Sequence, residues 1–543
     1  MLEARYFLLL LAVVSVNALP QIKLGGATIV GRSVSDSVQF FGGIPFAEPP
    51  LGGLRLNPPV LKTRLPPTVL NASSYGNACV QPPIMDNPPP QSEDCLFINV
   101  YRPASVPKSQ LLPVMFFTPG GAFVVGGSNR FDGKDLVAHS VERGTPIIYV
   151  NHNYRLGPLG FPQGQEADDE GALNLGVLDQ IAALEWVQAN IHAFGGDKDK
   201  VTIAGLSAGA MMVGVLFLNP QLGKLARAGI LESGSSNGVT AFPASRNEAV
   251  WQAFVEKVPS CARVASTGRT FECLKEASTE EVALAMSQIV PDSIISLKWA
   301  PTLDFGRGSV YPDYASRLYE EGRFARLPFI AGTNRDEGTL FSIREPLTQD
   351  AIKDIIVTGY SPAATTEQEL NRTVDKLLEL YPEDPAVGSP YGTGEELFGL
   401  PASYKRVASL YGDLTFNAPR RQWSQAAAKA GVKSYAYHFT HPQAIPALGV
   451  PHGSESPYVY AQPPPTDPVG QEISNIMADY WISFTVSLTP NDGKGVKRPE
   501  WPQYTTKNQV VLQLEGGNTT AVEDDFRKEQ LDFLIKNSLV LRR

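Results

Sequence analysis

The chain has 543 residues, of which 43% are hydrophobic and 19% are charged, and this balance excludes a disordered or collagen-like protein. It carries 46 Lys and Arg against 55 Asp and Glu, a formal net charge of -9, so it lacks the basic excess typical of proteins that bind nucleic acids or anionic membranes. We therefore expect a globular protein whose partner is small and not polyanionic, with no nucleic-acid partner.

The first 18 residues resemble a secretory signal peptide. Arg5 precedes an apolar run at 6–16, and the small-residue pattern ending in Ala18 predicts cleavage after that residue. The run is shorter than the ~20 residues that cross a bilayer, and no later segment is long and apolar enough, so no integral membrane segment is expected. The sequence predicts a secreted protein in which residues 19–543, without visible repeats or linkers, form one domain.

The cysteines and three sequons agree with that compartment. The four cysteines form two local pairs without metal-ligand spacing, and an oxidising environment favours disulfides, so we expect the bonds Cys79–Cys95 and Cys261–Cys273 and no metal site. Glycosylation sequons begin at Asn71, Asn371 and Asn518.

Short apolar runs alternate with helix-like segments along much of the chain. Between residues 113 and 231 the runs at 114–118, 147–151 and 201–204 read as strands, and 177–190 reads as a helix. Later runs that extend the same sheet lie at 228–231, 329–332, 434–439 and 510–514. This pattern predicts an α/β fold with a mostly parallel sheet covered by helices. The long segments between the later runs, about 100 residues each, are expected to be helical excursions above the C-terminal edge of the sheet, where such sheets bind ligands.

A glycine-rich loop at 119–123 follows the strand predicted at 114–118. Such a loop supplies backbone N–H donors to the oxyanion that forms when a nucleophile attacks a carbonyl, and Gly121 and Ala122 are the expected donors. An ordinary glycine-rich turn is the alternative. A phosphate loop is disfavoured because no Gly-Lys-Ser/Thr sequence follows.

The pentapeptide GLSAG at 205–209 lies between a predicted strand and a helix-like run. This context predicts a sharp turn that exposes the Ser207 hydroxyl, with the N–H of Ala208 as a further oxyanion donor. A second match, GSSNG at 234–238, is followed by no helix whose amides stabilise an anion. Ser207 is therefore the predicted nucleophile, and Ser236 is not.

A serine nucleophile needs a histidine base oriented by a carboxylate. In the order Ser, acid, His, three of the six histidines follow Ser207. His438 lies inside a predicted strand, whereas His452 lies on a loop and is the better base. The loop after the strand at 329–332 carries both Asp336 and Glu337, and these residues alone do not decide which is the acid.

Several longer motifs occur in a fixed order along the chain: FGGIPFAEPP at 41–50, EDCLFINVY at 93–101, NYRLG at 153–157 and FGGD at 194–197, before the turn at 205–209. Together they resemble the type-B carboxylesterase/lipase family, which includes cholinesterases, carboxylesterases and fungal extracellular lipases. The resemblance covers nearly the whole mature chain and implies an α/β-hydrolase fold that needs no cofactor.

The resemblance also assigns roles to individual residues. Glu337 matches the acid of the family's Asp-Glu-Gly motif, and His452 matches the histidine of its Gly-x-x-His motif. Arg55 and Glu93 resemble the family's structural ion pair, and Ser233 resembles its serine beside the triad. The two cysteine pairs also fall near the family's usual disulfides.

Three departures from the family bear on the substrate. Leu206 replaces the acidic residue that cholinesterases carry before the nucleophile, and Met85 lies where they place a choline-stacking tryptophan, so choline esters are not expected. The 15 residues at 80–94 make a short, proline-rich lid, which argues against strong interfacial activation.

The expected function is hydrolysis of carboxylic esters with apolar or aromatic acyl groups by a Ser-His-Glu triad through an acyl-enzyme. The alternatives are a lipase or sterol esterase acting on aggregated long-chain substrates and a feruloyl-type aryl esterase. A noncatalytic adhesion protein of the same family is disfavoured because such members typically lack the nucleophile.

Overall fold

The computed structural model describes residues 19–83, 90–105, 110–289, 297–305 and 308–543. The proposed signal peptide and Met85 lie outside these residues, as does part of the predicted lid. The strands are β1 (Gln21–Leu24), β2 (Ala27–Val30), β3 (Arg32–Ser33), β4 (Val38–Pro45), β5 (Val69–Asn71), β6 (Phe97–Pro103), β7 (Leu112–Thr118), β8 (Ile148–His152), β9 (Gly196–Leu206), β10 (Ala228–Glu232), β11 (Phe329–Asn334), β12 (Ser434–Phe439), β13 (Val510–Leu514) and β14 (Thr520–Glu523).

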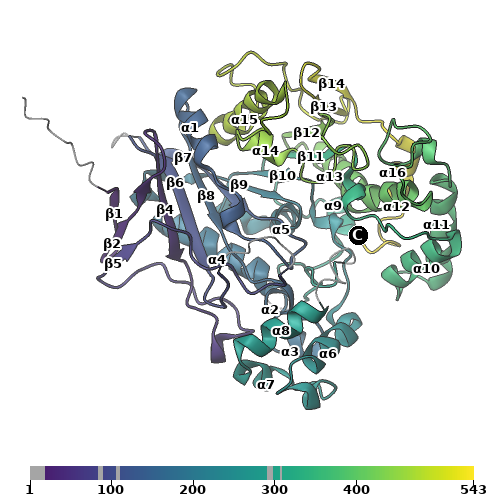
Figure 1. Ribbon diagram of the computed structural model, residues 1–543, viewed down its shortest axis with the longest axis horizontal. Coiled ribbons are helices and arrows are strands. Elements are labelled where there is room, and N and C mark those ends of the chain that lie inside the picture. Colours follow the sequence, from purple (N-terminus) through teal and green to yellow (C-terminus); the bar gives the residue numbers. More distant parts are fainter. Residues whose placement is uncertain (1–18, 84–89, 106–109, 290–296, 306–307) are drawn as a thin grey trace, which may run out of the picture.

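The described residues form one large mixed sheet and one small sheet (Figure 1). The large sheet has eleven strands in the order β14-β13-β12-β11-β10-β9-β7-β8-β6-β4-β3, and the small one has the order β1-β2-β5. From β8 to β13 neighbouring strands are parallel, whereas β6, β4 and β3 at one edge and β14 at the other are antiparallel. The prediction of a mostly parallel α/β sheet is confirmed.

Helices fill the connections between these strands. They are α1 (Lys134–Glu142), α2 (Gly157–Gly160), α3 (Gln165–Asp169), α4 (Leu175–Asn190), α5 (Ala208–Phe217), α6 (Glu248–Glu256), α7 (Phe271–Glu276), α8 (Thr279–Ile289), α9 (Ala315–Glu320), α10 (Gln349–Tyr360), α11 (Glu367–Leu380), α12 (Ser403–Gly412), α13 (Ala418–Lys429), α14 (Ser456–Val459), α15 (Gly470–Ser487) and α16 (Lys528–Lys536). In the described ranges, none of them has both the length and the apolar character needed to span a membrane.

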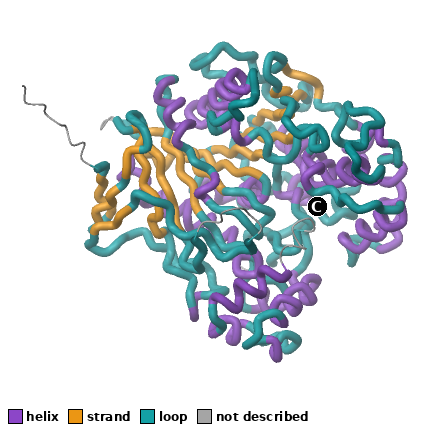
Figure 2. The backbone as a smooth tube through the Cα atoms, viewed as in Figure 1, coloured by secondary structure: helices purple, strands orange, loops and turns teal. Residues whose placement is uncertain are grey.

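The strands are buried on both faces, which explains why they read as nearly continuous apolar runs. Successive side chains of a strand point to opposite faces, so β9 places Val201 and Ile203 in one core and Ala204 in the other. Helices α4, α5 and α13 pack on the first face, and α1 and α15 pack on the second. Figure 2 shows the strands gathered in a layer with helices around it.

Two groups of helices extend beyond this layer. Helices α6, α7 and α8, in the segment between β10 and β11, share one apolar cluster, and α10, α11 and α16 share another. The two groups lie in different parts of the molecule (Figure 1). The predicted helical excursions between the later strands are therefore present.

Covalent and ionic links tie the N-terminal segment to this scaffold. The structure forms the disulfides Cys79–Cys95 and Cys261–Cys273. Nε of Arg55 donates to Oε2 of Glu93 at 2.7 Å in a buried ion pair. The same guanidinium donates to backbone carbonyls at the end of α7, so the pair joins the N-terminal segment to the helices after β10.

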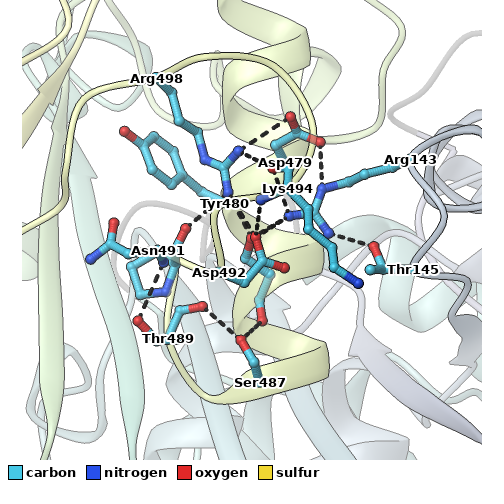
Figure 3. Close-up of polar contacts among 12 residues, drawn as sticks. Arg143, Thr145, Asp479, Tyr480, Ser487, Thr489, Asn491, Asp492, Lys494 and Arg498 are labelled. Atoms are coloured by element: carbon cyan, nitrogen blue, oxygen red, sulfur yellow. Dashed lines mark hydrogen bonds and ion pairs between the residues drawn. The ribbon is translucent and has the colours of Figure 1, made fainter.

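A second buried ionic cluster joins α1 to α15 (Figure 3). Asp479 on α15 is fully buried and lies 2.8 Å from Nε of Arg143, 3.4 Å from Nη1 of Arg498 and 3.0 Å from Nε2 of His139. Arg143 and Arg498 also contact Asp492 in the loop after α15. The cluster holds the loop after α15 against α1 and α15.

Candidate active site

Ser207 occupies a tight turn between β9 and α5, and its backbone has φ 59° and ψ -127°, a conformation that is costly for a residue with a side chain. A Cβ at Gly205 would lie 2.5 Å from the carbonyl carbon of Gly209, and a Cβ at Gly209 would lie 2.0 Å from the carbonyl oxygen of Thr118. The flanking glycines therefore let the turn close against its neighbours. Ser207 itself is partly exposed between buried residues.

His452 lies on the loop that follows β12. Its Nδ1 is 2.6 Å from Oε2 of Glu337 at the carboxyl end of β11. Its Nε2 is buried and has no hydrogen-bond partner among the described residues. His452 and Ser207 line the same cavity, so the unpaired nitrogen is the atom available to a proton from the serine hydroxyl.

The two acidic neighbours have different environments. Asp336 accepts hydrogen bonds from Ser389 Oγ and Tyr391 N at 2.8 Å each and from Val450 N at 2.9 Å, so it anchors the loop that carries His452. Glu337 instead contacts the imidazole directly. The geometry therefore separates the two carboxylates that the sequence left as alternatives.

Buried partners fix the other oxygen of Glu337. Oε1 accepts from Ser233 Oγ at 2.6 Å and from the backbone N of Asn334 at 2.7 Å. The side-chain amide of Asn334 donates to Glu455 at 2.6 Å, and Ser233 Oγ lies 3.2 Å from the same carboxylate. Burial and then the charge of Glu337 raise the pKa of Glu455. These contacts leave Oε2 of Glu337 to the imidazole.

Sequence reasoning found Ser233 but missed Asn334 and Glu455. Both lie three residues from a predicted site residue, Asn334 before Glu337 and Glu455 after His452. That spacing brings them to the same turns, and it is the signal that would have identified them.

A fourth buried carboxyl, Glu232, lies at the end of β10. Burial and then the nearby Glu455 raise its pKa to about 8, although the hydrogen bond that Trp481 Nε1 donates to its Oε1 at 2.7 Å works in the opposite direction. Its Oε2 has no hydrogen-bond partner within the described residues. The carboxyl therefore holds a proton at neutral pH.

This proton makes stability depend on pH. The native state binds it more tightly than the unfolded chain, so the stabilisation is fully present below the ordinary pKa of 4.5 and is lost as pH rises through about 8. Glu232→Gln removes this titrating group but keeps an acceptor for Trp481. Between pH 5 and 9 we expect the free energy of unfolding of this variant to fall less steeply than that of wild type, by up to about 1.4 kcal/mol per pH unit. Calorimetry across this range tests it, with Glu379→Gln at an exposed carboxylate as control. Equal slopes in wild type and Glu232→Gln would contradict the prediction.

The predicted oxyanion donors line the same cavity as Ser207. Gly121 and Ala122 lie in the loop after β7, and a Cβ on the adjacent Gly120 would lie only 2.9 Å from the Cβ of Ser207. Ala208 is the first residue of α5, where backbone N–H groups have no partner within the helix. All three residues line the cavity that Ser207 and His452 share.

That cavity has a volume of about 320 Å³ and a largely apolar wall. Side chains that line it include Phe131, Leu206, Met211, Phe341, Tyr411 and Phe416. The rings of Phe416 and Phe341 lie 4.5 Å and 5.1 Å from the imidazole of His452. Phe416 belongs to a π-helical turn, Asp413–Asn417, between α12 and α13, and such turns are frequent at functional sites.

The rejected residues lie elsewhere. Ser236 is buried and its hydroxyl is hydrogen-bonded to Tyr319. His438 is buried in β12 with its ring stacked on Phe526, and burial lowers its pKa to about 3. His441 contacts Asp467 at 2.7 Å. None of these three lines the cavity.

Residues 18–534 match the carboxylesterase family. The chain is 32% identical over 551 residues to the secreted triacylglycerol lipase LIP1 of Gibberella zeae, which covers 95% of this chain and 90% of that relative. It is also 32% identical to lipase 1 of Geotrichum candidum over 94% of each chain. The solved structure of Aspergillus niger EstA matches with a TM-score of 0.84 at 26% identity, over 97% of this chain and 100% of that one, in agreement with the α/β-hydrolase fold. The chain therefore belongs to the carboxylesterase family, as an enzyme of its type-B carboxylesterase/lipase group.

Proposed function

We propose that this protein hydrolyses carboxylic esters with apolar or aromatic acyl groups, with Ser207 as nucleophile, His452 as base and Glu337 as the orienting acid. The observation that carries the proposal is the 2.6 Å contact between Glu337 and Nδ1 of His452, a histidine whose Nε2 has no hydrogen-bond partner in the described chain and which lines the same cavity as Ser207.

In acylation, Oγ of Ser207 attacks the ester carbonyl carbon while Nε2 of His452 takes its proton. Glu337 holds the imidazole in the required tautomer and stabilises the imidazolium. Backbone N–H groups of Gly121, Ala122 and Ala208 stabilise the oxyanion. The carbon–oxygen bond to the alcohol then breaks, and the alcohol leaves with the proton from Nε2.

Deacylation repeats these roles with water. His452 takes a proton from the water as its oxygen attacks the acyl-serine carbonyl. The bond to Oγ of Ser207 breaks, the proton returns to Oγ, and the carboxylic acid leaves. The residues named supply every proton transfer, and the proposal invokes no cofactor or metal.

The apolar wall of the cavity supports apolar or aromatic acyl groups, because burying such a group contributes favourable free energy in proportion to its area. Leu206, next to the nucleophile, presents no anion to a cationic alcohol. A second candidate is a lipase acting on aggregated long-chain esters, which the names of the Gibberella and Geotrichum relatives favour. The short segment 80–94 favours the soluble-ester reading.

Initial rates on p-nitrophenyl esters from acetyl to palmitoyl, below and above each solubility limit, separate these candidates. We expect rates that peak at short or medium chains and do not rise when the substrate aggregates. A rate that climbs with chain length and jumps above the solubility limit would favour the lipase, and methyl ferulate in the same series tests the aryl esterase. Hydrolysis by wild type that equals the rate without protein would contradict the esterase proposal itself.

We also propose secretion after removal of residues 1–18. The Gibberella relative is named as secreted, and the two disulfides suit an oxidising compartment. The sequon residues Asn71 and Asn518 are exposed and Asn371 is partly exposed, which supports their use as glycosylation acceptors.

A further inference from the structure

The loop that carries two of the proposed oxyanion donors has a strained backbone. Ala122 and Phe123 have φ values of 53° and 64°, which are rare for residues with a side chain. Such strain persists only where the surrounding structure determines it strongly. The contacts that hold this loop therefore decide whether its N–H groups keep the orientation that catalysis needs.

Peptide planarity relates these contacts to the donors. The carbonyl oxygen of Gly121 accepts from the backbone N of Val124 and of Val125 at 3.0 Å each. The N–H of Ala122 belongs to the same peptide plane and points the opposite way. The carbonyl oxygen of Gly120 faces Gly126, since a Cβ on Gly126 would lie 2.5 Å from it. The N–H of Gly121 belongs to the same peptide and therefore points away from Gly126.

The side chain of Gln81 holds Gly126 in place. Its Oε1 accepts from the backbone N of Gly126 at 2.8 Å, and its Nε2 donates to the carbonyl of Gly126 at 2.9 Å. The side-chain amide thus pairs with both backbone groups of one residue, as a neighbouring strand would. Gln81 is buried, and its Nε2 also donates to the carbonyl of Cys79 at 3.1 Å.

The backbone around Gln81 is itself held in place. Cys79 is bonded to Cys95, and the backbone N of Gln81 donates to Oε1 of Gln91 at 3.0 Å. On the other side of the loop, the hydroxyl of Tyr154 donates to the carbonyl of Pro119 at 3.0 Å. Gln81 therefore connects a covalently closed segment to the far end of the oxyanion loop.

We propose that Gln81 is a positioning residue that fixes the oxyanion loop through its paired hydrogen bonds to Gly126. The inference rests on the proposed function, because it concerns the donors Gly121 and Ala122 of that reaction. It goes beyond the triad because Gln81 touches neither the substrate nor the reacting atoms. Without these two hydrogen bonds, the loop samples orientations in which the N–H groups of Gly121 and Ala122 no longer meet the oxyanion.

The test compares Gln81→Met, which keeps the length of the side chain but loses its amide, with wild type on p-nitrophenyl butyrate. Removing one oxyanion donor outright costs about 10²- to 10³-fold in kcat, so we expect loosening the loop to lower kcat by roughly 10- to 100-fold with KM within about twofold. The affinity for a trifluoromethyl ketone, whose hemiketal oxyanion occupies the same hole, should fall by the same factor as kcat/KM.

Gln163→Met is the matched control. Gln163 is also buried, and its amide makes four hydrogen bonds, to Phe161, Ala300, Asn247 and Thr302, none of them with the oxyanion loop. We expect this variant to lose thermal stability while keeping kcat and the ketone affinity within about twofold of wild type. Gln81→Asn, which keeps the amide but is one methylene too short, replaces Gln81→Met if the latter does not fold.

Assaying Ser207→Ala alongside distinguishes a failure of the Gln81 proposal from a failure of the esterase proposal. If wild type shows Ser207-dependent hydrolysis while the Gln81 variants keep kcat and ketone affinity, the positioning role is wrong and the esterase assignment stands. If wild type shows no Ser207-dependent hydrolysis, both fail. An equal loss of kcat in Gln163→Met would also overturn the inference, because general destabilisation would then explain the effect.

Discussion

Ser207→Ala is expected to lower kcat for a soluble p-nitrophenyl ester by about 10⁵- to 10⁶-fold. The hydroxyl is the atom that forms the acyl-enzyme, and the residual rate comes only from the oxyanion donors and from substrate positioning. The turn should remain intact, because alanine at 207 removes only an oxygen for which the described residues give no structural partner. Stopped-flow and long-time-course assays on the purified variant together measure the difference.

Ser236→Ala is the matched control, since it changes the serine of the other glycine-flanked pentapeptide. Its hydroxyl is buried against Tyr319 and lies outside the cavity, so we expect kcat to stay within about twofold. A loss of activity in Ser236→Ala with activity retained in Ser207→Ala would reverse the assignment.

Glu337→Gln is expected to lower kcat by about 10⁴-fold with the fold preserved. Glutamine keeps the volume of the side chain, but its amide is neutral and can stabilise the wrong imidazole tautomer when it faces Nδ1 of His452. The oxygen that accepts from Ser233 and Asn334 can remain in place, so the effect is on charge and tautomer. Steady-state kinetics with thermal melts measure both quantities.

The neighbouring Asp336→Asn provides the comparison. Asp336 accepts hydrogen bonds from Ser389, Tyr391 and Val450, and the last of these anchors the loop of His452, so we expect a loss of stability and a fall in kcat of less than about 100-fold from misplacement of the ring. A larger fall for Asp336→Asn than for Glu337→Gln would transfer the acid role to Asp336.

The parallel strands could be predicted because burial on both faces gives short, continuous apolar runs. The runs at 434–439 and 510–514 coincide with β12 and β13, the run at 147–151 is shifted by one residue in β8, and the other predicted strands are present with longer bounds. The antiparallel strands β4 and β6 were not predicted as strands. Their pairing joins residues far apart in sequence, and β4 contains Gly42 and Gly43 at a bulge, so the local pattern does not show the ladder.

The same distinction applies to the site. Ser207 could be predicted because strand, turn and helix are consecutive in sequence. The choice between Asp336 and Glu337 depends on which carboxylate faces a loop more than 100 residues later, and only the family resemblance pointed to Glu337. Gln81 was missed because its role comes from contacts with Gly126, 45 residues away, that no local pattern records.

The central claim is that Ser207 is the nucleophile of an esterase, and labelling with a fluorophosphonate tests it most directly. Intact-mass measurement followed by peptide mapping should find one adduct per chain, on Ser207, with loss of ester hydrolysis in proportion to labelling and no adduct in Ser207→Ala. An adduct on Ser236 or another serine, or full labelling of Ser207→Ala, would contradict the account.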